Sequence, residues 1–311
     1  MDSGLVVLSF AAIALMRVAQ KICSKKVSTE VQGKAFFHYG GYYNLLSAVF
    51  SLITLFIVGF EGFDFPTVLC ALATAVCLAI ELFASLEALK GASLIVNQMF
   101  SVGALFIPCI VGIFFFDEPM SVWQWLGLFL FIVAMCFMVA PAKKQQEEKT
   151  TKITVKTILM LLLTLVAGGG TMVAQKAFAK VVPNGSVATY SFLMFALNAI
   201  ILYTCYAVSI YVGKKKTYSS QPQEIKKDVA PLSKILLICG LALAFAIFII
   251  NMLVTELGKS VDSAILFSVS NAISIIITIL VGSIYYKEKI MFKNVIGVVL
   301  CVGALAIINF L

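Results

Sequence analysis

Two charged residues lie deep inside apolar segments, where an ionised side chain needs a partner or a function. Arg17 lies about 13 residues into the first apolar run and Glu81 about 15 residues into the third. At 1.5 Å per helical residue, both would lie about 20 Å from the point where their helix enters a membrane. Such a group costs about 2.5–3.5 kcal/mol inside a bilayer. We therefore expect the two side chains to pair, or to handle a substrate or a proton.

Uncharged polar side chains at helical spacing indicate the faces that would line a cavity between helices. Gln20 lies one turn from Arg17, and Asn97 lies one turn from Ser101. Serine and asparagine also join membrane helices by hydrogen bonds, so a packing role stays open for them. With three residues of the ninth apolar run, the candidates for substrate binding or coupling are Arg17, Gln20, Glu81, Asn97, Ser101, Phe267, Asn271 and Ser274.

Other polar positions favour structural roles. Lys21 and Lys176 lie near the ends of apolar runs, where a lysine can extend its ammonium group to the membrane surface. Glu118 and Glu288 sit at tight turns, where a carboxylate can accept from exposed backbone N–H groups at the next helix start. Residues 168–170 are three glycines inside an apolar run with no strand before them, which predicts close helix packing or a hinge rather than a phosphate-binding loop.

The sequence lacks the side chains that most redox and zinc enzymes need. His38 is the single histidine, which excludes haem and zinc sites built on several histidines within one chain. The 8 cysteines are scattered singly in apolar runs, so we interpret them as packing residues. We predict no catalytic residue, no metal site and no cofactor.

Ten apolar segments must position the candidate residues. The chain of 311 residues is 61% hydrophobic and 12% charged, which is typical of a protein covered by lipid. Runs of about 20 residues cross a bilayer, and at this length only helices satisfy their own backbone in lipid. The predicted fold is an all-α integral membrane bundle of ten transmembrane helices. The runs occupy approximately 4–24, 39–60, 66–88, 92–116, 121–140, 153–176, 187–211, 232–256, 260–286 and 290–310.

An internal repeat divides these runs into two sets of five. The sequence Val-Ala-Gln-Lys at 18–21 recurs at 173–176, and Glu118 recurs as Glu288. Because five is an odd number, the second set must enter the membrane in the opposite orientation, and such inverted repeats are typical of transporters. The predicted organisation is a first repeat at 1–140, a polar linker at 141–152 and a second repeat at 153–311.

The repeat bears on the two membrane charges. The positions equivalent to Arg17 and Glu81 hold Met172 and Ile250. Both charges are missing together, as expected of a pair, because one ion alone would be buried without compensation. A structural ion pair that locks the first helix to the third and a pair that handles substrate or protons both remain consistent with this.

The net charge of +8 arises from lysines in the connections between apolar runs. It therefore indicates topology rather than nucleic-acid binding. Connections after the odd-numbered runs hold nearly all of these lysines, whereas the even-numbered ones are more acidic. Because short cytoplasmic connections are enriched in Lys and Arg, the count places both termini outside.

Several short sequence patterns occur in a fixed order along the chain. In the second half Thr278 stands where Pro108 would repeat, so no proline hinge is expected in the ninth helix. The patterns are Ala88-Leu89-Lys90-Gly91-Ala92-Ser93, Pro108, Phe116-Asp117-Glu118-Pro119, Trp125-Leu126-Gly127, and later Leu257-Gly258-Lys259, Lys287-Glu288 and Ile296-Gly297. Together they resemble the drug/metabolite transporter superfamily and, within it, the EamA-like permeases. The resemblance implies a secondary carrier, commonly with cytoplasmic termini, opposite to the lysine count.

The predicted function is transport of a small metabolite or drug-like solute by alternating access. No nucleotide-binding motif is present, so we expect an ion or solute gradient to drive it, with export favoured over uptake. An integral membrane enzyme acting on a lipid or small hydrophobic substrate is the alternative, and it would need a cluster of His, Asp or Glu at one membrane face. The expected partners are a small-molecule substrate and membrane lipid, without nucleic acid. The expected state is a multi-pass monomer or homodimer in a cell membrane, the bacterial inner membrane.

Overall fold

The computed structural model describes residues 3–31, 35–60, 62–89, 92, 94–118, 120–139, 154–217, 233–285, 296–297, 299–300, 302–304 and 306–307. Every regular element in these ranges is helical. The helices are α1 (Ser3–Glu30), α2 (Ala35–Val58), α3 (Phe65–Leu89), α4 (Leu94–Gly103), α5 (Phe106–Phe115), α6 (Val122–Val139), α7 (Val155–Val181), α8 (Val187–Thr217), α9 (Lys234–Leu257) and α10 (Ser263–Leu280), followed by a π-helical turn, η1 (Val281–Tyr285).

Within the described residues, 7 helical segments are long and apolar enough to cross a membrane. They are α1, α2, α3, α4 together with α5, α7, α8 and α9, while α6 and α10 contain shorter apolar stretches. The last predicted run, 290–310, is described only in short pieces. The chain is thus a multi-pass, all-helical membrane protein, and the count of ten helices stays a prediction.

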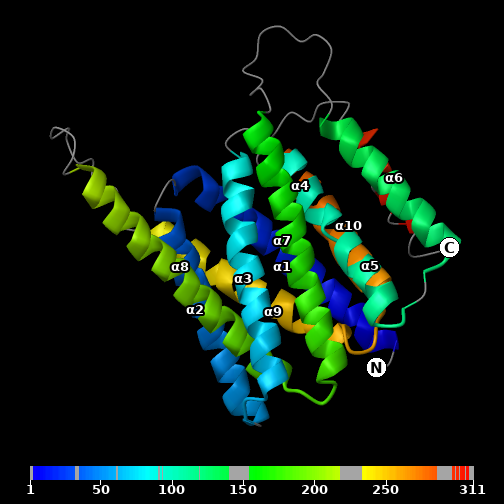
Figure 1. Ribbon diagram of the computed structural model, residues 1–311, viewed down its shortest axis with the longest axis horizontal. Coiled ribbons are helices and arrows are strands. Elements are labelled where there is room, and N and C mark those ends of the chain that lie inside the picture. Colours follow the sequence, from blue (N-terminus) through cyan, green and yellow to red (C-terminus); the bar gives the residue numbers. More distant parts are fainter. Residues whose placement is uncertain are drawn as a thin grey trace, which may run out of the picture.

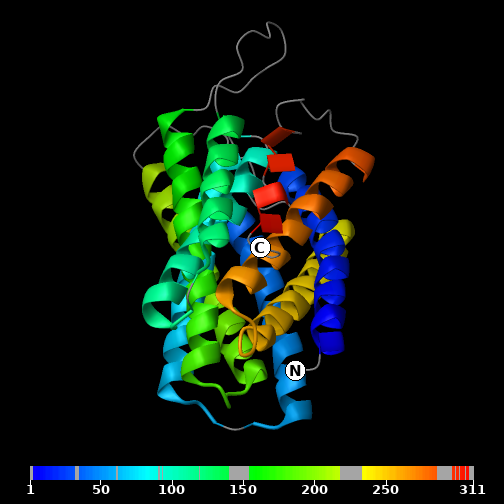
Figure 2. The same cartoon turned by 90° about the vertical axis from the view of Figure 1, so that its right-hand side faces the viewer.

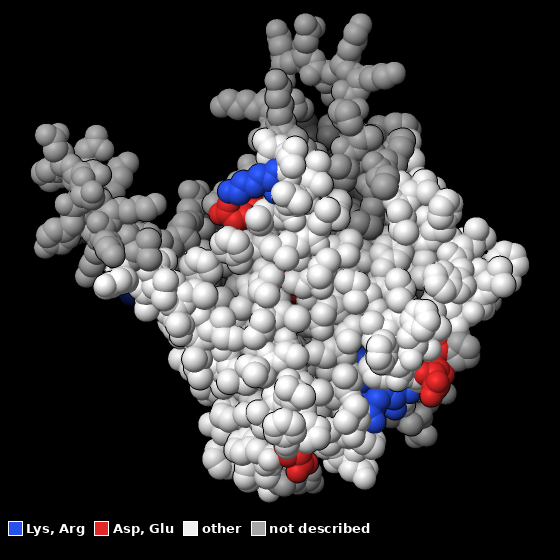
Figure 3. Space-filling model, viewed as in Figure 1, with Lys and Arg blue, Asp and Glu red and all other residues white. Residues whose placement is uncertain are grey.

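The outer surface fits a lipid environment. Figure 3 shows few charged side chains on this face, near the ends of the bundle, with a wide uncharged surface between them. Large apolar side chains point outward, such as Phe56 and Val122, which are 81% and 82% exposed. In water such a surface would be costly, whereas lipid tails cover it.

The fourth predicted helix is broken where its sequence requires. A proline has no N–H group to bond the carbonyl four residues earlier, and its ring crowds that carbonyl. Accordingly the chain turns at Ala104 and Leu105, and the Ala104 carbonyl accepts from Ile107 instead, at 3.2 Å. In α10 the equivalent Thr278 donates to the Ser274 carbonyl at 2.7 Å, and the helix continues through it. The break seen before Pro108 is therefore not repeated before Thr278.

Helices from the two halves of the sequence pack against each other. In Figure 1, α2 and α8 lie on one side of the bundle and α6 on the other, and Figure 2 shows α1, α9 and α10 together. The pairs α3–α7, α2–α8 and α1–α9 are all in contact, and each joins one half to the other. Neither half is therefore a separate unit, and residues from both can meet at the centre.

Three glycines in α7 permit its close approach to α3, α4 and α5. A Cβ atom at Gly169 would lie 2.5 Å from Ile107 Cδ1, and one at Gly170 would lie 2.8 Å from Cys77 Sγ. The prediction of close helix packing at residues 168–170 is confirmed.

Gly169→Ala is expected to destabilise the protein by about 1–3 kcal/mol, because the new methyl group overpacks against Ile107. Thermal unfolding in detergent micelles measures the effect. Gly4→Ala is the matched control, since a Cβ there meets nothing within 4 Å. If Ile107→Ala fails to relieve the loss caused by Gly169→Ala, the overpacking explanation is incorrect.

Candidate functional site

A cavity of about 280 Å³ lies between the helices, with polar side chains from both halves of the chain in its wall. Seven of the eight predicted candidates line it. They are Arg17 and Gln20 of α1, Glu81 of α3, Ser101 of α4, and Phe267, Asn271 and Ser274 of α10. Polar residues that recur at helical spacing in the apolar segments therefore line one cavity, as predicted.

Arg17 and Glu81 face this cavity without a direct ion pair between them, although both belong to the described residues. The Arg17 guanidinium instead donates from Nη1 to Gln20 Oε1, one turn along the same helix, at 2.8 Å. Its Nε atom is buried and has no partner within the described structure. The expected direct salt bridge between Arg17 and Glu81 is thus wrong, because the Arg17 guanidinium is hydrogen-bonded to the neutral amide of Gln20 instead.

Glu81 is held by contacts from two other helices. Ser101 donates a hydrogen bond from Oγ to Glu81 Oε1 at 3.3 Å. On the other side, a Cβ at Gly168 would lie 3.3 Å from that same oxygen, so the glycine leaves room for the carboxylate. The carboxylate therefore sits in a fitted position between α4 and α7.

Lys21 also points into the cavity, and its expected interfacial role is wrong. Its Nζ atom donates to Gln98 Oε1 at 2.5 Å, and Gln98 Nε2 donates to Ser274 Oγ at 3.2 Å, which joins α1, α4 and α10. Its ammonium group is thus held inside the protein by Gln98 and is not extended toward a membrane surface. The sequence did contain a signal for this position, because Lys21 lies four residues from Arg17 and so on the same face of α1.

Asn97 is the one candidate outside the cavity wall. Its Nδ2 atom donates to Ser85 Oγ at 2.7 Å, and Ser85 is the residue that lines the cavity. Asn97 and Ser101 lie four residues apart, which is slightly more than one helical turn. Asn97 is therefore rotated toward α3 and supports the wall from behind.

Several amide side chains in the wall were not predicted. Gln175 of α7 donates from Nε2 to Asn251 Oδ1 of α9 at 2.7 Å. Asn198 of α8 is 2% exposed, and its Oδ1 atom has no partner in the described part of the chain. Gln175 is the repeat equivalent of Gln20, a signal that the sequence did contain.

Comparison with known proteins identifies the family of the chain. A model of the EamA-like transporter family matches residues 155–310, half of the chain. The chain belongs to the EamA-like transporter family. This family is part of the drug/metabolite transporter superfamily, so the protein is a membrane transporter of that type.

A solved structure extends the likeness in fold to nearly the whole EamA-like chain. Titled only as the crystal structure of a protein, it covers 98% of this chain and 96% of its own, with a TM-score of 0.67 and 14% identity. At that identity the likeness concerns the fold alone. No curated protein matches the sequence.

One end of this EamA-like bundle is held by a buried ion cluster. Glu118 Oε1 lies 2.8 Å from Lys176 Nζ and 3.3 Å from Lys180 Nζ, and Lys176 is only 1% exposed. Lys176 also donates to the Val261 carbonyl at 2.6 Å. The expected surface role of Lys176 is therefore wrong, because its charge is neutralised inside the protein.

Glu118 has the structural role that its turn position predicts, but with a distant helix. Its Oε2 atom accepts from the Ser263 backbone N–H at 3.0 Å, at the start of α10. Asp262, at the N-cap of α10, makes no capping hydrogen bond with its side chain, so Glu118 replaces it. Asp117 has a φ of 51°, which turns the carboxylate of Glu118 back over Gly112. Glu288, its repeat equivalent, lies outside the described residues.

The electrostatics of Glu118 follow from these contacts. Burial raises the pKa of its carboxyl group, but the hydrogen bonds from Lys176 and from the Ser263 backbone lower it by more. The net pKa lies below the ordinary value of 4.5, so the group is ionised at neutral pH. We call Glu118, Lys176, Lys180 and Ser263 the Glu118 cluster.

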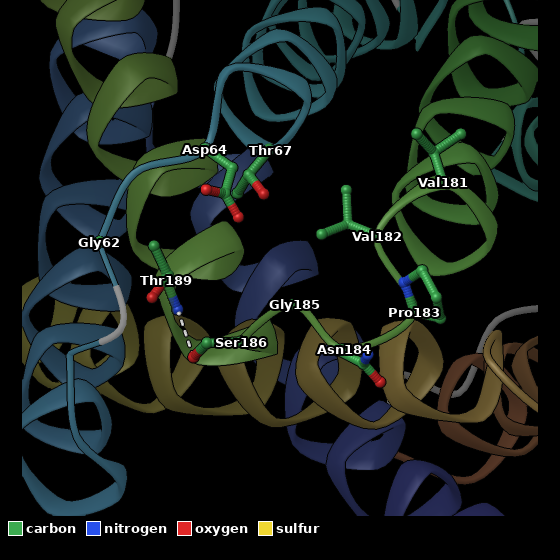
Figure 4. A pocket seen from close by; sticks show the side chains of 10 residues that line it. All are labelled: Gly62, Asp64, Thr67, Val181, Val182, Pro183, Asn184, Gly185, Ser186 and Thr189. Carbon is green, nitrogen blue, oxygen red and sulfur yellow. Dashed lines mark hydrogen bonds between the residues drawn. The ribbon is translucent and has the colours of Figure 1, made fainter.

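A second cavity, of about 330 Å³, lies beside the turn between α7 and α8 (Figure 4). Its polar groups belong largely to that turn, where Ser186 Oγ accepts from the Thr189 N–H at 3.3 Å. The chain turns at residues 183 and 184, and Ser186 caps α8. None of the eight candidates lines this cavity, so the central one is the candidate transport site.

Proposed function

We propose that the protein is a secondary carrier that moves a small polar solute across a cell membrane by alternating access. The observation that carries this proposal is the central cavity, whose wall holds charged and polar side chains within an otherwise apolar helical bundle. An enzyme acting on lipid is less well supported, because the described residues include no group of three or more His, Cys, Asp or Glu side chains suited to a metal.

The packing of the helices supports an inverted repeat of residues 1–140 and 153–311. If α1, α2, α3 and α4–α5 are equivalent to α7, α8, α9 and α10, each contact between the halves has a counterpart. The pair α3–α7 corresponds to α9–α1, α3–α8 to α9–α2, and α4–α7 to α10–α1. If the equivalent helix pairs exchanged their conformations, the cavity would open first to one side of the membrane and then to the other.

An asymmetry between equivalent lysines fits one stage of such a cycle. Lys176 is engaged in the Glu118 cluster at one end of the bundle, whereas its equivalent Lys21 points into the cavity toward Gln98. We assign the Glu118 cluster to the closed end. Because Glu81 is the acidic residue of the cavity, we also propose that it couples transport to a proton gradient, in the export direction and in the bacterial inner membrane.

Transport by the purified protein tests this function. Proteoliposomes are incubated with a metabolite extract, and mass spectrometry identifies solutes that cross faster than in protein-free liposomes. Ser101→Cys then allows a bulky thiol reagent to plug the cavity after folding, and the unsubstituted protein treated with the same reagent is the control. We expect the plugged variant to lose transport. Solutes that cross equally well after plugging, or no solute crossing at all, would contradict the proposal.

A further inference from the structure

The charges inside the cavity do not balance. Arg17 and Lys21 contribute two positive charges to its wall, Glu81 contributes one negative charge, and the other lining residues are uncharged. The formal charge is therefore +1. An uncompensated charge inside the bundle is unfavourable, and the cavity wall contains no second negative charge to balance it.

Neither cation is paired directly with the one carboxylate. Arg17 donates to Gln20 and Lys21 donates to Gln98, and both partners are neutral amides. Glu81 accepts from a neutral serine hydroxyl. Two other carboxylates are engaged elsewhere, Glu87 by Lys156 and Glu118 by Lys176 and Lys180. Two cationic groups thus remain available to a bound molecule.

Unpaired hydrogen-bond donors lie in the same wall. Arg17 Nε and Asn271 Nδ2 are buried and lack partners among the described residues, and Asn271 is only 7% exposed. They belong to α1 and α10, which pack against each other. Buried donors without acceptors are costly unless a ligand supplies the acceptors. An ionised acidic group offers only acceptors, and it bonds most strongly to cationic donors.

We propose that the substrate is a small organic anion of one negative charge, whose acidic group binds between Arg17, Lys21 and Asn271. This inference rests on the proposed function. The acceptors of the wall, Glu81 and the unpaired Oδ1 of Asn198, take hydroxyl or N–H groups on the body of the same molecule. A net-neutral amino acid would leave the charge of +1 in place, and an apolar drug would leave the polar wall unsatisfied.

The metabolite-extract experiment decides the class of substrate when the transported solutes are sorted by charge at neutral pH. We expect them to be monoanions that carry hydroxyl or N–H groups. Transport confined to neutral, zwitterionic or cationic solutes would overturn this inference and leave the carrier function intact. Transport of nothing at all would overturn both, so the two failures are distinguishable.

Arg17→Gln is expected to weaken anion binding by about 10- to 100-fold, measured as the concentration for half-maximal transport. Lys156→Gln is the matched control, because it removes the same charge from a lysine side chain that is 72% exposed. Asn271→Asp serves if the arginine variant does not fold, since it keeps the size of the side chain and cancels the net charge of the cavity. Unchanged anion affinity in a folded Arg17→Gln or Asn271→Asp variant would refute the assignment.

Discussion

Glu81→Gln is expected to uncouple transport from the proton gradient while leaving the protein folded. The amide keeps the shape of the side chain and can still accept from Ser101, but it cannot bind a proton. It also raises the formal charge of the cavity from +1 to +2, so a bound anion is held more tightly. We expect accumulation driven by a pH gradient to fall to that of protein-free liposomes, whereas exchange of labelled for unlabelled substrate persists.

A double variant separates this coupling role from a purely structural one. Arg17→Met with Glu81→Ile copies the residues found at the equivalent positions of the second half. If the two charges serve only to join helices, the double variant keeps both stability and transport. If they handle substrate and protons, it is stable but inactive, because the cavity loses the guanidinium that binds the acidic group and the carboxylate that binds the proton, although Lys21 remains. Full transport by the double variant would therefore reject the functional assignment.

The central cavity was largely predictable because polar side chains inside apolar segments are costly and so follow the buried face of a helix. Helical spacing alone grouped Gln20 with Arg17, and Asn271 with Ser274, on helix faces that do line the cavity. The same spacing misplaced Asn97, because the face of a helix is read only to within one residue. Its contact with Ser85 depends on how α3 packs against α4, which no local pattern records.

The two lysines were misjudged for a different reason. The ends of apolar runs were taken as the ends of helices, but α1 extends to Glu30 through a segment rich in polar residues. Lysine is a good helix former and is favourable near a helix C-terminus, so hydropathy underestimates helix length there. The partner of Lys176 could not be predicted from the sequence either. It is Glu118, which also caps the start of α10 at Ser263, 145 residues after Glu118 in the chain.

The number of helices was the least secure part of the predicted fold. The fourth apolar run is long enough for one helix, yet Pro108 divides it into α4 and α5. Hydropathy counts such a run as one span and does not reveal the break. The proline was visible in the sequence, and its effect follows from the hydrogen bond that it cannot donate.

Glu118→Gln is expected to give a large loss of stability, about 3–5 kcal/mol, because it leaves the ammonium group of Lys176 buried without a counter-charge. The amide oxygen can still cap α10 at Ser263, so the loss reports mainly on the ion pair. Glu256→Gln is the matched control, since its pair with Lys259 is on the surface with a glutamate side chain 49% exposed, and it should cost no more than about 1 kcal/mol. Denaturant unfolding in micelles measures both variants, and equal losses would show that the Glu118 cluster does not hold the bundle closed.

The pH dependence of the same variant gives an independent reading. The pKa of Glu118 in the folded protein lies below its ordinary value of 4.5, so its ionised form stabilises the fold at any pH above that value. This contribution is lost as the pH falls through the lowered pKa, because the folded carboxyl group must then take up a proton and release Lys176. The stability advantage of the unsubstituted protein over Glu118→Gln should therefore be constant near neutral pH and shrink in strong acid. An advantage that instead grew on acidification would mean that Lys176 does not stabilise the ionised carboxylate.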